Sequence, residues 1–249
     1  MVSKQEVRPD VKVRTLPMQV ASHLVRRIAA GELADEHVPS ELEITQQFGV
    51  SRVVARETLK ILSSLDIVHI AQGRRVVLRP AEEWDYLSPQ LLEWLPEDQV
   101  TDLLREFQEA RLLLEPELAA RAATMITKSS LRRLNELVDR MVELEGSPED
   151  YLEVDHAFHM EICRASQNRI LDRIMYAARW LLATSRRVTN EEPHGLAAAT
   201  AIHREILEAI ESADAELARQ VMHRHMELNI QILGKPKRTG RVRRRPARS

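Results

Sequence analysis

The sequence contains few cysteines and few aromatic residues, and each shortage excludes a class of protein. Cys163 is the one cysteine in 249 residues, so the chain has neither a disulfide framework nor a cysteine-based zinc site. Aromatic residues make up 4% of the chain, which is low for a β-sandwich or a carbohydrate-binding surface. No apolar run approaches the roughly 18 residues that span a bilayer, and the start of the chain lacks the apolar core of a signal peptide. We therefore expect a soluble, cytoplasmic protein with no membrane partner.

Leucine, alanine, glutamate and arginine are abundant instead, and these residues favour helices. The chain is 44% hydrophobic and 30% charged. Its length fits one large domain or two ordinary ones, with room for a sizeable core. The composition therefore predicts a mostly α-helical protein.

The formal net charge of −2 hides an uneven distribution of charge along the chain. Residues 1–80 carry 12 basic and 9 acidic side chains, residues 81–234 carry 16 and 29, and residues 235–249 carry 8 and none. The head and the tail are therefore basic, whereas the body is strongly acidic. This asymmetry favours contact with a polyanion through the two ends of the chain.

Three short helices are predicted between residues 17 and 65. Apolar residues recur every four positions along the first of them, at Val20, Leu24 and Ile28. Gly31 follows where a helix C-cap is expected. Ser40 and Ser51 stand at the N-cap positions of the second and third helices.

The residues that follow predict a β-hairpin. Two short runs rich in β-branched residues, 67–71 and 75–78, flank a turn that contains Gly73. Three helices and a hairpin make a winged helix-turn-helix, in which the third helix enters the DNA major groove.

Several residues are placed to contact DNA in such a unit. Arg52 and Arg56 lie one turn apart on the third helix, where they face guanine edges or phosphates. The hairpin tip, Gln72, Gly73 and Arg74, would reach the minor groove or the backbone. The alternative is that the arginines only solvate an exposed helix.

Helical periodicity continues from residue 101 to residue 233 and predicts an all-α bundle. The expected helices cover 101–126, 129–145, 148–165, 167–187, 195–211 and 214–233. Short polar or glycine-containing stretches separate them. The expected domains are a DNA-binding domain over 1–80, a linker over 81–100, a helical domain over 101–233 and a basic, disordered tail over 234–249.

The histidines of the helical domain have a spacing that suits a metal ion. Asp155 and His159 are one turn apart, and His203 lies on a later helix. His223 and His225 lie on the last helix and face different sides, so one of the two could join the others. One carboxylate and three imidazoles suit zinc, and also manganese or nickel. Spacing alone favours the alternative, a chance pair and histidines that belong to the core or the surface.

The run PSELEITQQFGVSRVVARETLKIL, residues 39–62, resembles the signature of the GntR family of bacterial transcription regulators. The resemblance implies that Arg52 and Arg56 contact the operator. It also implies that Ser51 contacts the DNA backbone and that Gln72 and Gly73 contact DNA from the wing. Two departures concern specificity. Arginine replaces the second glycine of the usual wing pattern, and Leu42 stands where some relatives place an arginine that contacts DNA.

The helical domain resembles the FCD effector domain of FadR-type members of that family. Asp155 to His159 is similar to its D-x-x-F-H motif, and residues 109–119 are similar to the E-x-R-x-x-l-E-p motif that opens it. In the metal-binding subset of these domains one aspartate and three histidines are the ligands. The resemblance assigns them here to Asp155, His159, His203 and His225, with His223 as the alternative on the last helix.

The resemblance also implies that a small carboxylic acid binds at the metal. Arg111 is the expected partner of its carboxylate, and the alternative is an ion pair with Glu115 at i+4. Asn168, Trp180 and Arg187 are further expected effector contacts, although Asn168 also suits a helix N-cap and Trp180 also suits the core. The connector from Trp84 to Leu95 resembles that of regulators of sugar-acid catabolism, which predicts a sugar-acid effector.

Together these features predict a nucleoid-associated bacterial repressor. It would act as a homodimer on a pseudo-palindromic operator and be released by the acid. One alternative is a metal sensor, in which the ion itself is the signal. A remote alternative is a metal-dependent hydrolase. The basic tail is either a general tether for nucleic acid or part of the regulation.

Overall fold

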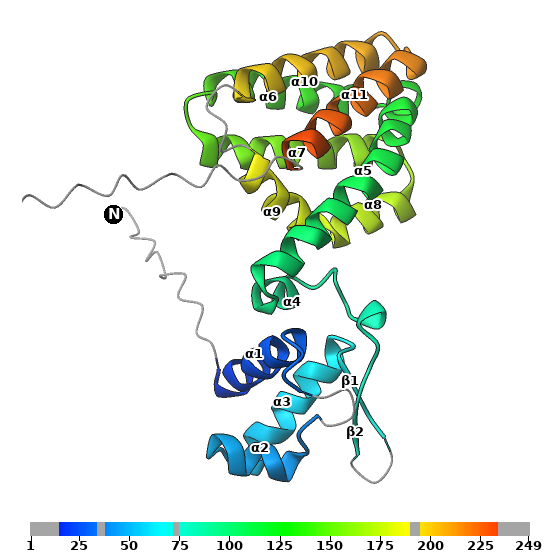
Figure 1. Cartoon of the computed structure of the whole chain (residues 1–249). Helices are drawn as coiled ribbons and strands as arrows, with labels where there is room; N and C mark the ends of the chain where they lie inside the picture. The colour runs from blue at the N-terminus through cyan, green and yellow to red at the C-terminus, as the bar shows by residue number, and fades with distance from the viewer. Residues whose placement is uncertain (1–14, 34–37, 72–74, 190–194, 234–249) are drawn as a thin grey trace, which may run out of the picture. The chain divides into compact units, whose positions relative to one another are not determined.

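The computed structural model describes residues 15–33, 38–71, 75–189 and 195–233, without the side chains of 185–189, 232 and 233 (Figure 1). The chain forms two compact units, residues 1–100 and 101–249. Within the described ranges no helix is long and apolar enough to cross a membrane. The expected disordered tail lies outside the described residues.

The first unit consists of short helices and a two-stranded sheet. In chain order these elements are α1 (Leu16–Ala29), α2 (Glu41–Phe48), α3 (Arg52–Ser64), β1 (Val68–Ile70), β2 (Val76–Leu78), the 3-10 helix η1 (Ala81–Glu83) and α4 (Pro89–Trp94). The strands pair antiparallel, with Val68 opposite Leu78. The predicted winged helix-turn-helix is therefore confirmed.

Local sequence explains the turn between α2 and α3. The Ser40 hydroxyl accepts a hydrogen bond from the Glu43 N–H, and the Glu43 carboxylate accepts one from the Ser40 N–H, which is a reciprocal capping box. Gly49 ends α2 at a φ of 63°, a left-handed conformation that glycine adopts without strain. The Ser51 hydroxyl then accepts from the Val54 N–H and caps α3.

Residues 81–100 belong to the first unit, whereas the sequence predicted a linker there. Leu91 and Trp94 are 0% and 1% exposed and join the core of this unit. The Trp84 indole N–H donates to the carbonyl of Arg79, 3.2 Å away. Burial of these large apolar side chains removes area from water that a free linker would expose, so the segment folds onto α1 and its neighbours.

Seven helices follow in the described part of the chain. They are α5 (Glu97–Met125), α6 (Lys128–Glu143), α7 (Pro148–Ala165), α8 (Arg169–Ala177), α9 (Arg179–Thr189), α10 (Gly195–Glu211) and α11 (Ala215–Leu233). The helices predicted over 148–165 and 195–211 have the observed ends. Those predicted over 101–126, 129–145 and 214–233 differ from α5, α6 and α11 by a few residues. The predicted all-α bundle is confirmed.

The helix predicted over residues 167–187 is wrong, because the structure has two helices there. Gln167 has a φ of 54°, outside the helical range, and the next residue caps α8. At Ala178, with φ −82° and ψ 1°, the chain bends again before α9 begins. Both α8 and α9 pack against α7, and the bend keeps both segments on that one neighbour.

The second unit has a large apolar core of its own. Leu118, Leu134, Phe158, Ile206 and Met226, which come from five different helices, are each 0% exposed. Helices α5, α6, α7, α10 and α11 therefore share one core, and the polar site described below is embedded in it.

Replacing Trp94 by alanine should lower the free energy of unfolding of the first unit by about 3–5 kcal/mol, because a fully buried indole leaves a cavity. Denaturant titration of the full chain, followed by circular dichroism, measures the loss. Trp180→Ala is the matched control, since Trp180 is 43% exposed. Equal small effects of both replacements would show that residues 81–100 do not stabilise the first unit.

Candidate functional site

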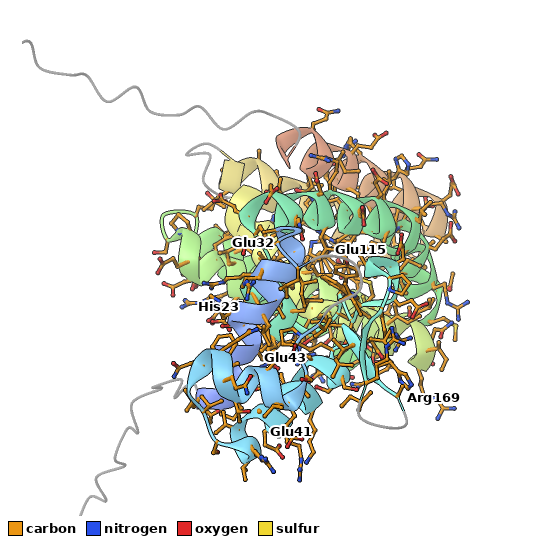
Figure 2. The ribbon with its side chains drawn as sticks, turned by 60° about the horizontal axis from the view of Figure 1, so that its bottom comes forward. His23, Glu32, Glu41, Glu43, Glu115 and Arg169 are labelled. Atoms are coloured by element: carbon orange, nitrogen blue, oxygen red, sulfur yellow. The ribbon has the colours of Figure 1, made fainter. Side chains whose placement is uncertain are left out.

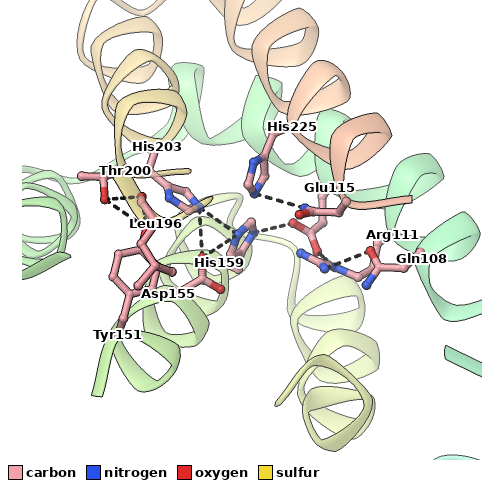
Figure 3. A network of polar contacts seen from close by, with 11 residues as sticks. Gln108, Arg111, Glu115, Tyr151, Asp155, His159, Leu196, Thr200, His203 and His225 are labelled. Atoms are coloured by element: carbon pink, nitrogen blue, oxygen red, sulfur yellow. Dashed lines mark hydrogen bonds and ion pairs between the residues drawn. The ribbon is translucent and has the colours of Figure 1, made fainter. Parts of the chain in front are cut away.

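Three histidines from three helices meet inside the second unit (Figure 3). They are His159 on α7, His203 on α10 and His225 on α11, and they are 1%, 0% and 2% exposed. One ring nitrogen from each lies within 4.8 Å of the others. The rings of His159 and His225 stack, and that of His203 stands at an angle to both. The structure thus brings together three of the four predicted ligands as donors around one point.

Asp155 completes the group. Its Oδ1 lies 3.2 Å from Nε2 of His203 and 3.9 Å from Nε2 of His159, and the carboxylate is 1% exposed. The alternative ligand on the last helix, His223, does not reach the cluster. Its side chain is 49% exposed and lies 3.6 Å from the Glu227 carboxylate.

A polar contact one turn away aligns the helices that carry these ligands. The hydroxyls of Tyr151 on α7 and Thr200 on α10 are 3.1 Å apart and buried. Tyr151 precedes Asp155 by four residues, and Thr200 precedes His203 by three. The contact therefore sets the register in which the aspartate meets the histidine.

A buried chain of polar side chains on α5 reaches the cluster from the other side (Figure 3). Glu115 Oε2 lies 2.6 Å from His159 Nδ1, and Glu115 Oε1 accepts from Arg111 Nε at 2.5 Å. Arg111 Nη1 in turn donates to the Gln108 carboxamide oxygen at 3.1 Å. Burial alone would raise the pKa of Glu115, but the charges and hydrogen bonds of Arg111 and His159 hold that pKa well below its usual value of 4.5.

The donor set fits a divalent metal ion. The Nε2 atoms of His159 and His203 lie 3.3 Å apart, and the tautomer of each ring decides which of them carries a proton. In the tautomers that turn both lone pairs inward, the two nitrogens can share one cation. Three imidazoles and one carboxylate are ligands that zinc accepts in a four-coordinate or larger site, and manganese and nickel accept related sets.

The expected effector residues have mixed positions. Arg111 is 0% exposed and makes the ion pair with Glu115 that was its alternative interpretation, but its Nη2 atom is buried without a hydrogen-bond partner. Asn168 caps α8 by accepting from two backbone N–H groups, which was also its alternative. Trp180 is 43% exposed under the Arg179 guanidinium. The side chain of Arg187 lies outside the described residues.

The expected DNA-contacting residues gather where α3 begins. Ser51 caps this helix, and Arg52 on its first turn is exposed. The Arg56 guanidinium is 56% exposed and pairs with the Glu41 carboxylate of α2 through contacts of 3.2 and 3.3 Å. Glu41 is labelled in Figure 2. The hairpin tip, Gln72, Gly73 and Arg74, lies outside the described residues.

Sequence reasoning missed several residues of this site. Glu115 was considered only as a partner of Arg111, and the aligning pair of Tyr151 and Thr200 was not considered. Neither was Asn229, whose Nδ2 lies 3.4 Å from Nε2 of His225. The i, i+4 spacing of Asn229 to the histidine would have indicated this contact. The spacing of Glu115 to His159, 44 residues, carries no such information.

Comparison with known proteins defines the class of this chain. The model of the "Bacterial regulatory proteins, gntR family" matches residues 16–78, and the model of the "FCD domain" matches residues 106–228. The chain therefore has the architecture of a bacterial transcription regulator in which a DNA-binding domain precedes an FCD domain.

Individual relatives agree with this class. The Escherichia coli transcriptional regulator YieP is 34% identical over 164 residues, 64% of this chain and 70% of the relative. The Escherichia coli galactonate operon transcriptional repressor is 25% identical over 185 residues, 74% of this chain and 81% of the relative. The solved structure of Lar from Listeria monocytogenes has a TM-score of 0.56 at 19% identity and covers 89% of this chain and 98% of its own, which shows the shared fold.

The chain belongs to the GntR family, in its FadR-type branch with an FCD domain. It is a transcription regulator and not an enzyme, so the hydrolase alternative is set aside.

Replacing Arg111 by methionine should lower the free energy of unfolding by about 3–5 kcal/mol, because the Glu115 charge is then buried without its partner. The Arg111→Met/Glu115→Gln double variant should recover most of this loss. Denaturant titration of both variants gives the coupling energy between the two residues. A single variant as stable as the wild type would show that the buried ion pair does not matter for folding.

Proposed function

We propose that this protein is an operator-binding repressor whose DNA affinity is controlled by a small carboxylic acid bound at a metal ion in the FCD domain. It acts in the cytoplasm as a homodimer, and the two α3 helices read the two halves of a pseudo-palindromic operator. The observation that carries the proposal is the buried convergence of Asp155, His159, His203 and His225 within a chain that belongs to a family of DNA-binding regulators.

DNA recognition is assigned to the start of α3 and to the wing. Helices enter the major groove by their N-terminal end, and Arg52 lies on the first turn of α3 and Arg56 on the next. The Glu41 carboxylate holds the Arg56 guanidinium in one orientation, which favours bidentate contact with a guanine. Ser51 and the wing residues Gln72, Gly73 and Arg74 complete the proposed contacts with the backbone and the groove.

The metal ion is zinc in this proposal, held by Asp155, His159, His203 and His225. A divalent ion in such a site supplies a Lewis acid that attracts oxygen ligands. With neutral imidazoles, the carboxylates of Asp155 and Glu115 outweigh the Arg111 guanidinium by one formal charge. Binding of a divalent ion reverses this balance, so the occupied site attracts an anion.

A carboxylate effector would satisfy groups that the protein leaves unused. Arg111 Nη2 and His156 Nδ1 are buried and have no hydrogen-bond partner, and such atoms are rare in folded proteins. A carboxylate oxygen accepts from the Arg111 donor, while a second oxygen binds the metal. Because Asn168 caps a helix and Trp180 is exposed, the proposal assigns the effector contact to Arg111 rather than to them.

The names of the relatives support a sugar acid. One relative is the galactonate operon repressor, and the Haemophilus influenzae Uxu operon regulator is 29% identical over 205 residues, 79% of this chain and 73% of the relative. Aldonates and uronates carry a carboxylate next to hydroxyl groups, a combination that metal and guanidinium bind together. Such a ligand changes operator affinity only by its differential affinity for the two states of the protein.

The test is a mobility shift of the zinc-loaded protein on the DNA upstream of its own gene, with galactonate, gluconate and galacturonate titrated in turn. One of these acids should weaken operator binding about 5–150-fold, the usual range of such coupling. Arg52→Ala should abolish operator binding and keep acid binding, whereas the exposed Arg133→Ala on α6 should change neither. Operator binding that no carboxylic acid alters would contradict the proposal.

A metal sensor is the second candidate, because the four side chains form a complete ligand set without an organic molecule. In that case removal of zinc by a chelator abolishes operator binding, zinc restores it, and the acids have no effect. The same titrations, repeated on the metal-free protein, separate the two functions.

A further inference from the structure

Glu115 uses both of its carboxylate oxygens inside the core. Oε2 lies 2.6 Å from Nδ1 of His159, and Oε1 accepts from Nε of Arg111 at 2.5 Å. The Glu115 side chain is 2% exposed, and the side chains of Arg111 and His159 are 0% exposed. The Glu115 carboxylate therefore has one orientation, which is set by the Arg111 guanidinium at Oε1 and by the His159 imidazole at Oε2.

This arrangement decides where the His159 proton resides. An ionised carboxylate only accepts hydrogen bonds, so the neutral imidazole must carry its proton on Nδ1. The lone pair is then on Nε2, the atom that faces Nε2 of His203 at 3.3 Å and Oδ1 of Asp155 at 3.9 Å. The hydrogen bond at one ring nitrogen thus prepares the other as a metal ligand.

We propose that Glu115 is the positioning residue of the metal centre: it locks His159 in the Nδ1–H tautomer and aims its Nε2 lone pair at the ion. Arg111 binds one carboxylate oxygen of Glu115, which leaves the other oxygen to the His159 imidazole. The inference rests on the proposed metal site, but the tautomer is a property of the metal-free protein and is tested there.

Replacing Glu115 by glutamine gives a sharp expectation. Arg111 only donates hydrogen bonds, so the glutamine carbonyl turns to the guanidinium and its NH₂ group faces Nδ1 of His159. Nδ1 must then accept, and the proton moves to Nε2, where it blocks the metal. In Arg111→Met/Glu115→Gln the carbonyl is free to turn to the histidine, and the Nδ1–H tautomer returns.

The experiment uses the full-length, ¹⁵N-labelled protein after removal of metal. Long-range ¹H–¹⁵N correlation spectra report which ring nitrogen of each histidine is protonated, and His159→Asn identifies the His159 signals. Zinc affinity is measured by competition with a chromophoric chelator. The matched control is Glu161→Gln, since Glu161 is a buried acid of α7 that is 5% exposed and pairs with Arg164 instead.

We expect Nδ1–H in the wild type and Nε2–H in Glu115→Gln, with zinc affinity lowered about 10–100-fold in that variant. Glu161→Gln should match the wild type, and Arg111→Met/Glu115→Gln should regain the wild-type tautomer and part of the affinity. An Nε2–H wild type, or a folded Glu115→Gln with wild-type zinc affinity, overturns the proposal. A wild type that binds no zinc contradicts the proposed metal centre, whereas the tautomer measurement still decides the role of Glu115.

Circular dichroism shows whether each variant folds. If Glu115→Gln does not fold, Arg111→Met/Glu115→Met replaces it, because two apolar side chains of similar volume leave no unpaired charge. This variant lacks any acceptor for Nδ1–H, so a mixture of tautomers and the same loss of zinc affinity are expected. Failure of this variant to fold as well would mean that Glu115 serves folding rather than positioning, which also overturns the proposal.

Discussion

The second unit depends on the buried negative charge of Glu115, which is stable in the core only while both Arg111 and His159 contact it. Moving the Arg111 and Glu115 ions out of water costs several kcal/mol each unless hydrogen bonds and opposite charge compensate. Glu115 meets this condition by joining α5 to α7 through His159, so the helices must pack correctly before the charge is stabilised. The same packing brings His203 and His225 to His159. Folding of the bundle and assembly of the ligand site are therefore one process.

The two units solve different physical problems. The first unit is a GntR-family DNA-binding domain, and Arg52 and Arg56, the side chains proposed to contact the operator, stay exposed near a helix start that serine and glycine define locally. In the proposed function the second unit recognises a small acid, and its candidate site is buried, where a low dielectric strengthens each contact. A ligand of the second unit influences the first only through states that it binds with different affinity. The regulatory function therefore depends on that difference and not on tight binding alone.

Sequence reasoning succeeded where short-range chemistry decides the structure. The N-caps Ser40 and Ser51 and the helix over 148–165 all follow from residues a few positions apart. It failed at Ala178, because an alanine carries no breaking tendency and the bend there results from packing on α7. It also failed at residues 81–100. The sequence predicted a connector there, but Trp84, Leu91 and Trp94 are buried in the core of the first unit, which holds the segment in place.

The candidate site divides in the same way. The sequence by itself indicated the family and the candidate metal ligands Asp155, His159 and His203. It also predicted the pairs that one helical turn brings together, Asp155 with His159 and Arg111 with Glu115, because helical spacing makes such neighbours predictable. Only the tertiary structure decided that Glu115 contacts His159, that His225 rather than His223 faces the cluster, and that Asn168 serves as a cap. These contacts join residues from different helices or depend on how a helix is rotated in its packing, and no local propensity encodes that rotation.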